Sequence, residues 1–164
     1  MYSFQVVKVG IAELDIVKVP NLIRTSGLGS CVGAVIYDLQ SGLAGLVHVM
    51  LPDSTLAKTG MINEAKYADT AIGVLIEQLL KKGAQRRHLK AKIAGGAQMF
   101  QFASSNDLMR IGPRNVEAVK HELKKNGIPL IAEDVGGNNG RTIEFNPKTG
   151  VLQIRTVNRG IMEL

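Results

Sequence analysis

The chain has 164 residues, a net charge of +6 and an apolar fraction of 45%, which together predict one globular domain over residues 1–164. It has no run of about 18 apolar residues, no basic segment followed by an apolar one at its start, and one cysteine, so we expect a cytoplasmic protein without membrane insertion. Aromatic residues make up 4% and tryptophan is absent, which argues against the stacking surfaces of single-strand nucleic-acid binders.

The first predicted elements are short strands. Residues Phe4–Val9 and Leu14–Val19 are rich in β-branched side chains and are separated by a turn, so both are predicted as strands. The glycine-rich segment Thr25–Gly33 is predicted as a loop. Two apolar runs, Val32–Asp38 and Leu43–Leu51, follow with a turn between them and are predicted to pair as a hairpin.

The second half of the chain is predicted to contain two helices. Apolar residues recur at helical spacing within Asn63–Lys82, and a second helix is expected over Arg114–Asn126, with a glycine after each. The other predicted strands are Lys90–Ala94, Ile128–Val135, Thr142–Phe145 and Val151–Val157. Because strands outnumber helices and two hairpins imply antiparallel pairing, the expected class is α+β, with mixed, largely antiparallel β-sheets layered with flanking helices.

Basic residues gather between Lys81 and Lys92. One interpretation is a docking surface for an acidic partner, either protein or nucleic acid. We favour a helix end followed by a solvated loop, because runs of charge are usually solvated. Nucleic-acid binding has no support beyond the net charge, so no nucleic-acid partner is expected.

The single cysteine, Cys31, lies in the glycine-rich segment, 17 residues ahead of His48. A thiolate is a strong nucleophile, and a neighbouring imidazole is the usual means of forming one at neutral pH. If opposed residue numbers in the hairpin add up to 79, the two side chains face each other. A sum of 81 leaves them diagonal on one face, and an even sum places them on opposite faces. The sequence leaves this register open.

Three residues ahead of the cysteine, Gly27, Gly29 and Ser30, are candidates for a substrate and oxyanion loop, because backbone N–H groups there can stabilise a developing negative charge. Thr25 begins the same segment, and its hydroxyl or the carbonyl beside it is placed to accept a hydrogen bond from His48. The plain alternatives are a buried cysteine acting as a small hydrophobe, a core histidine and a threonine that bonds locally.

Other motifs point to no cofactor. Cys31 and the three histidines lack metal-ligand spacing, so no metal site is expected. The glycines from Gly27 miss the dinucleotide-binding spacing by one residue, and no Walker sequence is present. Simple structural roles are predicted for Gly95-Gly96-Ala97 and Gly136-Gly137 as tight turns, Arg114-Asn115 as the opening of a helix and Arg141 as a surface charge.

Several blocks occur in order along the chain: Thr25–Gly33, His48–Pro52, Lys92–Phe100, Ile111–Asn115, Asp134–Gly137 and Gly140-Arg141. Together they resemble the CheD family, the chemoreceptor glutamine deamidases of bacterial and archaeal chemotaxis. The resemblance covers nearly the whole chain, and it is specific because the blocks keep the family's order and separations.

The resemblance implies a catalytic triad of Thr25, Cys31 and His48 in a single deamidase domain over residues 1–164, with a fold like the catalytic domains of deamidating toxins. The implied reaction converts glutamine side chains on the cytoplasmic domains of methyl-accepting chemotaxis receptors to glutamate, without a cofactor. It further implies binding and stimulation of the phosphatase CheC, and in some members hydrolysis of receptor methyl esters. The alternative is a non-catalytic regulatory module that docks to CheC or to receptors.

Overall fold

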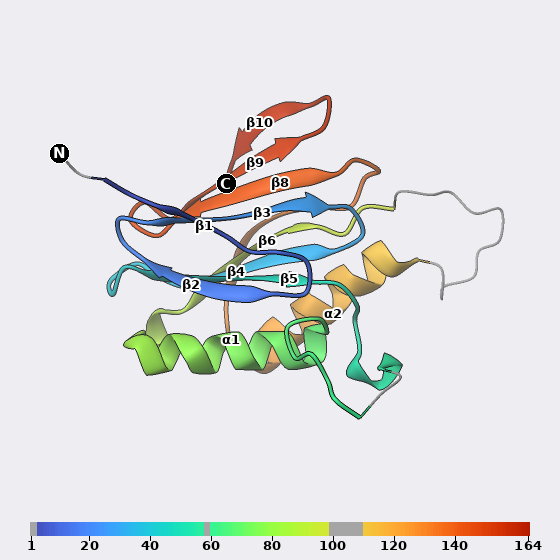
Figure 1. Ribbon diagram of the computed structural model, residues 1–164, viewed down its shortest axis with the longest axis horizontal. Coiled ribbons are helices and arrows are strands. Elements are labelled where there is room, and N and C mark those ends of the chain that lie inside the picture. The colour runs from blue at the N-terminus through green and yellow to red at the C-terminus, as the bar shows by residue number, and fades with distance from the viewer. Residues whose placement is uncertain (1–2, 58–59, 99–109) are drawn as a thin grey trace.

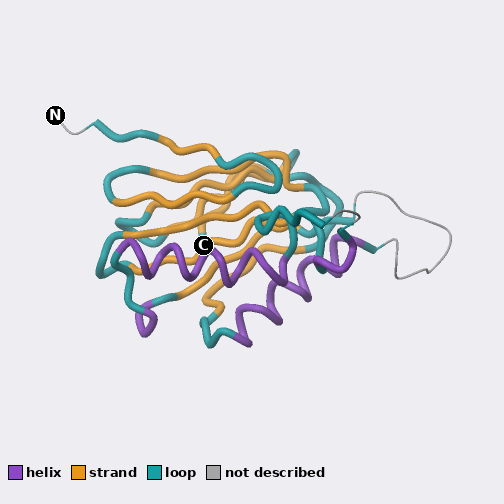
Figure 2. Tube along the Cα trace, turned by 60° about the horizontal axis from the view of Figure 1, so that its bottom comes forward, coloured by secondary structure: helices purple, strands orange, loops and turns teal. Residues whose placement is uncertain are grey.

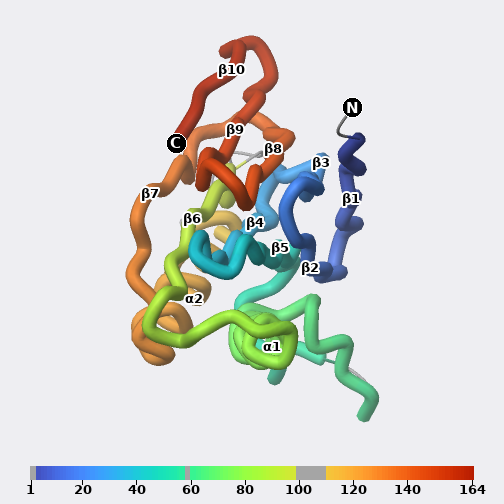
Figure 3. The backbone as a smooth tube through the Cα atoms, turned by 90° about the vertical axis from the view of Figure 1, so that its left-hand side faces the viewer, coloured from blue at the N-terminus to red at the C-terminus, as the bar shows by residue number. Residues whose placement is uncertain are grey.

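The computed structural model describes residues 3–57, 60–98 and 110–164 (Figure 1). Within these residues the chain forms two five-stranded β-sheets and two α-helices. Figure 3 shows the sheets stacked as two layers, with both helices forming a third layer against the second sheet. The predicted α+β class, with mixed and largely antiparallel sheets and flanking helices, is confirmed. None of the helices in these ranges has the length and apolar character needed to span a bilayer.

The first sheet has the strand order β1-β3-β8-β9-β10, and only the β1–β3 pair is parallel. Its strands are β1 (Val6–Lys8), β3 (Leu22–Leu28), β8 (Arg141–Asn146), β9 (Val151–Thr156) and β10 (Gly160–Glu163). The prediction of a loop over Thr25–Gly33 was wrong for its first four residues, which belong to β3. The register of β3 against β8 shifts between Thr25 and Leu28, so the chain bulges at Ser26 and Gly27 without leaving the sheet.

The second sheet has the order β2-β5-β4-β6-β7, with β6 and β7 parallel and the other pairs antiparallel. Its strands are β2 (Leu14–Lys18), β4 (Val32–Asp38), β5 (Leu43–Val49), β6 (Lys90–Gly95) and β7 (Leu130–Val135). Every residue of β4 and β5 is buried. These two strands lack an alternation of apolar and polar residues because the first sheet covers one face and the helices cover the other.

The helices lie side by side on the outer face of the second sheet (Figure 2). Helix α1 (Ala68–Lys82) ends at Gly83, whose φ of 116° suits glycine, and it begins five residues later than predicted. Helix α2 (Ile111–Lys125) begins three residues earlier than predicted, so Arg114 and Asn115 lie inside it. Two short 3-10 turns, Ser54–Leu56 and Arg86–His88, complete the elements.

The basic residues between Lys81 and Lys92 do not form one solvated surface. Lys92 is 8% exposed, and its Nζ donates to the carbonyl oxygens of Gly150 and Leu164 at 2.5 and 2.8 Å. Burial lowers the pKa of Lys92. This lysine therefore joins the β8–β9 hairpin to the end of the chain instead of presenting a charge to a partner.

Candidate active site

Cys31 and His48 both lie at the open end of the β4–β5 hairpin, without a hydrogen bond between them. Gly33 pairs with His48, so opposed residue numbers add up to 81 and the hairpin closes through a four-residue turn. Of the registers that the sequence left open, the diagonal one with a sum of 81 is formed, and the face-to-face one of 79 is not. Cys31 precedes β4 and packs against the apolar cluster between the sheets. It therefore lies diagonally to His48 on the side of the hairpin that faces the first sheet.

His48 is fully buried, and Thr25 of the other sheet orients its ring. The Thr25 hydroxyl donates to the carbonyl oxygen of Val9 at 2.7 Å and lies 2.7 Å from Nδ1 of His48. Because the hydroxyl proton is donated to the Val9 carbonyl, the hydroxyl oxygen accepts a hydrogen bond from Nδ1–H of His48, which assigns the tautomer of the imidazole. The lone pair is then on Nε2, which is buried and has no hydrogen-bond partner within residues 3–57, 60–98 and 110–164.

Burial sets the protonation of the two candidate groups. It raises the pKa of the Cys31 thiol, with the backbone N–H of Cys31 acting in the opposite direction. It lowers the pKa of His48. Both shifts favour the neutral forms. The arrangement suits a thiol that loses its proton to Nε2 during attack, in place of a permanent thiolate–imidazolium pair.

Hydrogen bonds tie the loop ahead of Cys31 to the turn that follows β6. The carbonyl oxygen of Gly29 accepts from the Ala97 N–H at 2.9 Å, and that of Cys31 accepts from the Gly96 N–H at 2.8 Å. The Gly29 N–H donates to Gly27, at 3.1 Å. Within the described ranges, the N–H groups of Ser30 and Cys31 have no backbone acceptor. The loop thus has the carbonyls of Gly29 and Cys31 fixed by the turn after β6.

Glycine is required where these segments cross. A Cβ at Gly95 would collide with the carbonyl oxygen of Cys31, and a Cβ at Gly96 would collide with Val116 of α2. Both residues also have positive φ values, 111° and 67°. The predicted tight turn at Gly95-Gly96-Ala97 therefore serves to bring β6 and α2 against the cysteine.

Sequence reasoning assigned minor roles to Asn115 and Arg141, and the structure places both inside the molecule. Asn115 is fully buried, and its Nδ2 donates to the carbonyl oxygens of Ser30 and Met50 at 2.9 and 3.0 Å. It shares the buried face of α2 with Val119, four residues later. That helical spacing is the signal that could have identified it.

Arg141 is 7% exposed, so the prediction of an ordinary surface charge was wrong. Its Nε donates to Asp134 at 3.1 Å and its Nη2 donates to the carbonyl oxygen of Gly136 at 2.8 Å. The inward-facing alternation of Ile143 and Phe145 along β8, extended back by two residues, could have placed Arg141 on the buried face.

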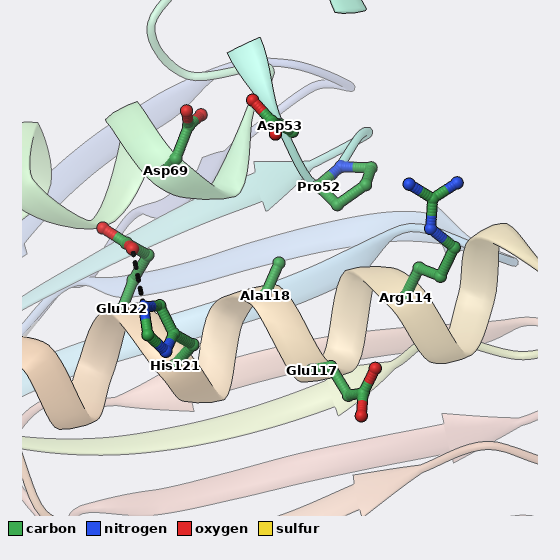
Figure 4. Close-up of a pocket in the computed structure, with 8 residues that line it drawn as sticks. All are labelled: Pro52, Asp53, Asp69, Arg114, Glu117, Ala118, His121 and Glu122. Carbon is green, nitrogen blue, oxygen red and sulfur yellow. Dashed lines mark ion pairs between the residues drawn. The ribbon is translucent and has the colours of Figure 1, made fainter. Parts of the chain in front are cut away.

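The described residues contain no group of three or more His, Cys, Asp or Glu residues placed to hold a metal ion. Figure 4 shows a surface cavity of about 380 Å³ between α2 and the segment after β5, and none of the candidate catalytic residues lines it. Its lining mixes acidic and basic side chains and consists of Pro52, Asp53, Asp69, Arg114, Glu117, Ala118, His121 and Glu122.

Comparisons with known proteins support the family resemblance that the sequence blocks indicated. A family model described as "CheD chemotactic sensory transduction" matches residues 50–156. The chain is 62% identical to the chemoreceptor glutamine deamidase CheD of Halalkalibacterium halodurans, over 97% of this chain and 98% of that protein. It is 60% identical to the protein of the same name from Bacillus subtilis, over 94% and 93%. Among solved structures, Neisseria meningitidis protein NMB0706 matches with a TM-score of 0.49 and 7% identity, over 82% of this chain and 65% of that one.

Proposed function

The chain belongs to the CheD family, and we propose that it is a chemoreceptor glutamine deamidase in which Cys31 is the nucleophile. The single observation that carries the proposal is the hydrogen-bond chain from Val9 through Thr25 to His48, which leaves Nε2 as a free base. The two relatives described above act, by their names, on glutamines of chemoreceptors, and we propose the same substrate class for this chain.

In the proposed first half-reaction, Nε2 of His48 takes the thiol proton of Cys31 while the sulfur attacks the side-chain amide carbon of a glutamine. The carbonyl oxygen becomes negatively charged in the tetrahedral intermediate. When the intermediate collapses, the imidazolium returns its proton to the departing nitrogen, and ammonia leaves. The product of this step is a thioester between Cys31 and the former glutamine side chain.

In the second half-reaction, a water molecule attacks the thioester carbon and gives a proton to Nε2 of His48. Collapse of this second intermediate breaks the carbon–sulfur bond, and the imidazolium returns its proton to the sulfur. The product leaves as a carboxylic acid, which ionises to glutamate. Each turnover consumes one water and one glutamine amide and yields one glutamate and one ammonia. Thr25 acts in both steps by holding the imidazole in one tautomer and one orientation.

We assign stabilisation of the oxyanion to the backbone N–H groups of Ser30 and Cys31, because neither has a backbone acceptor in the described ranges. Gly27, with a φ of +71°, and Gly29 shape the loop that presents them. The Gly29 N–H is bonded to Gly27 and is therefore assigned to loop geometry.

The family resemblance also leads us to propose that the chain is a single cytoplasmic domain over residues 1–164 that binds and stimulates CheC. Hydrolysis of receptor methyl esters fits the same thioester chemistry, since methanol would replace ammonia as the leaving group. These parts of the proposal rest on the resemblance and not on a contact within the site.

The test is mass spectrometry of a receptor cytoplasmic fragment incubated with the protein. A gain of about one mass unit at particular glutamines, with release of ammonia, is the expected result of replacing NH₂ by OH. The Cys31→Ala variant is the matched control and should leave the fragment unchanged. A parent protein that binds the fragment without altering its mass would instead support a non-catalytic docking module and overturn the deamidase proposal.

A further inference from the structure

The open end of the β4–β5 hairpin is a fork. The last paired residues are Val32 and Val49, and beyond them the two strands separate. After the fork, β5 turns away, because the N–H groups of Met50 and Leu51 donate to the carbonyl oxygen of Lys66 at 2.9 and 3.0 Å. The ladder of hydrogen bonds between β4 and β5 therefore ends before it reaches Cys31.

Asn115 spans this fork from α2. Its one NH₂ group donates to Ser30, the residue before Cys31, and to Met50, two residues after His48, at 2.9 and 3.0 Å. Because both partners are carbonyl oxygens, the NH₂ group and not the Oδ1 atom faces them. The Asn115 side chain therefore links the two segments through its two hydrogen bonds, at the point where the backbone hydrogen bonds between β4 and β5 have ended.

The backbone around Asn115 is seated tightly enough to make this bridge rigid. A Cβ at Gly112 would collide with the carbonyl oxygens of Ala97 and Gly96, so the first turn of α2 lies directly against the turn that holds the Cys31 carbonyl. Asn115 itself is fully buried. Its position is thus fixed from the helix side, and the two strands are fixed to it.

Stability alone does not account for an asparagine here. The Oδ1 atom of Asn115 is buried and has no hydrogen-bond partner among the residues that the structure describes, which is costly for a polar atom. Apolar side chains of similar size would remove that cost, and they fill two other buried positions of the helix, Val119 and Leu123. Unlike an apolar side chain, the amide can donate two hydrogen bonds at once.

We propose that Asn115 is a positioning residue that fixes the separation between the Cys31 sulfur and the His48 imidazole. The inference rests on the proposed roles of Cys31 and His48, and Asn115 acts through them without touching the substrate. Loss of its NH₂ group frees the cysteine loop from the histidine strand, so proton transfer from sulfur to Nε2 becomes slower.

The test uses the rate of Cys31 alkylation by iodoacetamide near neutral pH, which requires no receptor. We expect Asn115→Leu to lower this rate about tenfold, as would a displacement of the base. The matched control is Asn126→Leu, which removes a side-chain hydrogen bond to Glu122 at the other end of the same helix and should alkylate at the parent rate. Thermal unfolding shows whether both variants are folded. Asn115→Ala is the second variant if leucine does not fold, with the same expectation.

A double-mutant cycle separates positioning from a structural role. His48→Ala should lower alkylation at least as much as Asn115→Leu, and adding Asn115→Leu to His48→Ala should change the rate by less than about twofold. An equal Asn115→Leu effect with and without His48, or alkylation of Asn115→Leu at the parent rate, would overturn the inference. If His48→Ala itself alkylates at the parent rate, the proposed base fails, and that outcome is distinct from a failure of Asn115.

Discussion

The two ends of the β4–β5 hairpin differ in the hydrogen bonds that their buried polar side chains form. At the closed end, the fully buried carboxylate of Asp38 accepts hydrogen bonds from the backbone N–H groups of Gln40, Ser41 and Gln85 at 3.0, 3.2 and 2.9 Å. At the open end, Nε2 of His48 and Oδ1 of Asn115 are buried and have no hydrogen-bond partner among the described residues. The comparison teaches that the carboxylate stabilising the turn is fully bonded while these two atoms beside the cysteine are not, although Nδ1 of His88 next to Asp38 is also buried without a hydrogen bond in the described ranges.

The charges at the two ends follow the same division. Burial alone would raise the pKa of Asp38, but the hydrogen bonds from Gln85, Ser41 and Gln40 together lower it, so this end holds a permanent negative charge. His88 lies beside it, with Nδ1 at 3.6 Å from the carboxylate. At the open end, burial favours a neutral Cys31 and a neutral His48. One end holds an ionised structural carboxylate, and burial at the other end favours uncharged groups.

The largest expected effect is at the open end. Cys31→Ala removes the nucleophile, and we expect the rate of ammonia release from a receptor fragment to fall by at least about 10³-fold. The thermal midpoint should stay close to that of the parent, because the side chain is small and only partly buried. Ammonia release by the folded variant at more than a tenth of the parent rate would contradict the nucleophile assignment.

At the closed end the expected effect is on stability. Asp38→Ala leaves three N–H groups without their acceptor, and we expect the free energy of unfolding to fall by about 3 kcal/mol. Urea denaturation measures this, while kcat below the unfolding transition should stay near that of the parent. Because the folded pKa lies below the ordinary value of 3.8, the contribution of Asp38 is present above that pH and is lost as the pH falls through the folded pKa. A folded but inactive Asp38→Ala protein would contradict the claim that the closed end contributes to stability and not to the reaction.

Substitutions of Thr25 test whether its hydroxyl orients the His48 imidazole. Thr25→Val keeps the shape but cannot accept from Nδ1 of His48, so we expect kcat to fall by about 10²-fold with a smaller change in KM. Thr25→Ser keeps the hydroxyl and should stay within a few-fold of the parent. If Thr25→Val and Thr25→Ser have the same kcat, the hydroxyl does not orient the imidazole.

The smallest expected effect is on the pH profile. Burial lowers the pKa of His48, so the neutral base should persist below pH 6.5, and the acid limb of kcat/KM should lie below that value. Steady-state rates of ammonia release between about pH 5 and 8 measure this limb. An acid limb above 6.5 would instead indicate that the imidazolium is stabilised by a thiolate at rest.

The sequence predicted those parts of the fold that depend on local pattern. The bounds of β4, Val32–Asp38, were predicted correctly, because a buried strand reads as a continuous apolar run. Strand β3 was missed because Ser26-Gly27 looks like a loop and is a bulge, a distinction that depends on pairing with β8. Strand β10 was missed because all its residues are exposed, so it lacks an apolar face.

The site was predicted less completely, because its geometry is not local. The register depends on the length of the turn after Asp38, which the carboxylate sets by binding the N–H groups of Gln40 and Ser41. The hydrogen bond between Thr25 and His48 was anticipated, but it joins two different sheets, and no spacing along one strand specifies how sheets stack. Asn115 was overlooked because the helix was predicted to begin at Arg114, whereas α2 begins three residues earlier and Asn115 lies inside it.

The most direct measurement of the central claim, that Cys31 forms a thioester with the substrate, is interception by hydroxylamine. With the parent protein and a receptor fragment, hydroxylamine should divert part of the product from glutamate to glutamyl hydroxamate, and Cys31→Ala should form neither. Glutamate formation that continues in Cys31→Ala, or that proceeds in the parent with no hydroxamate at saturating hydroxylamine, would contradict the thioester and with it the account of the open end of the hairpin.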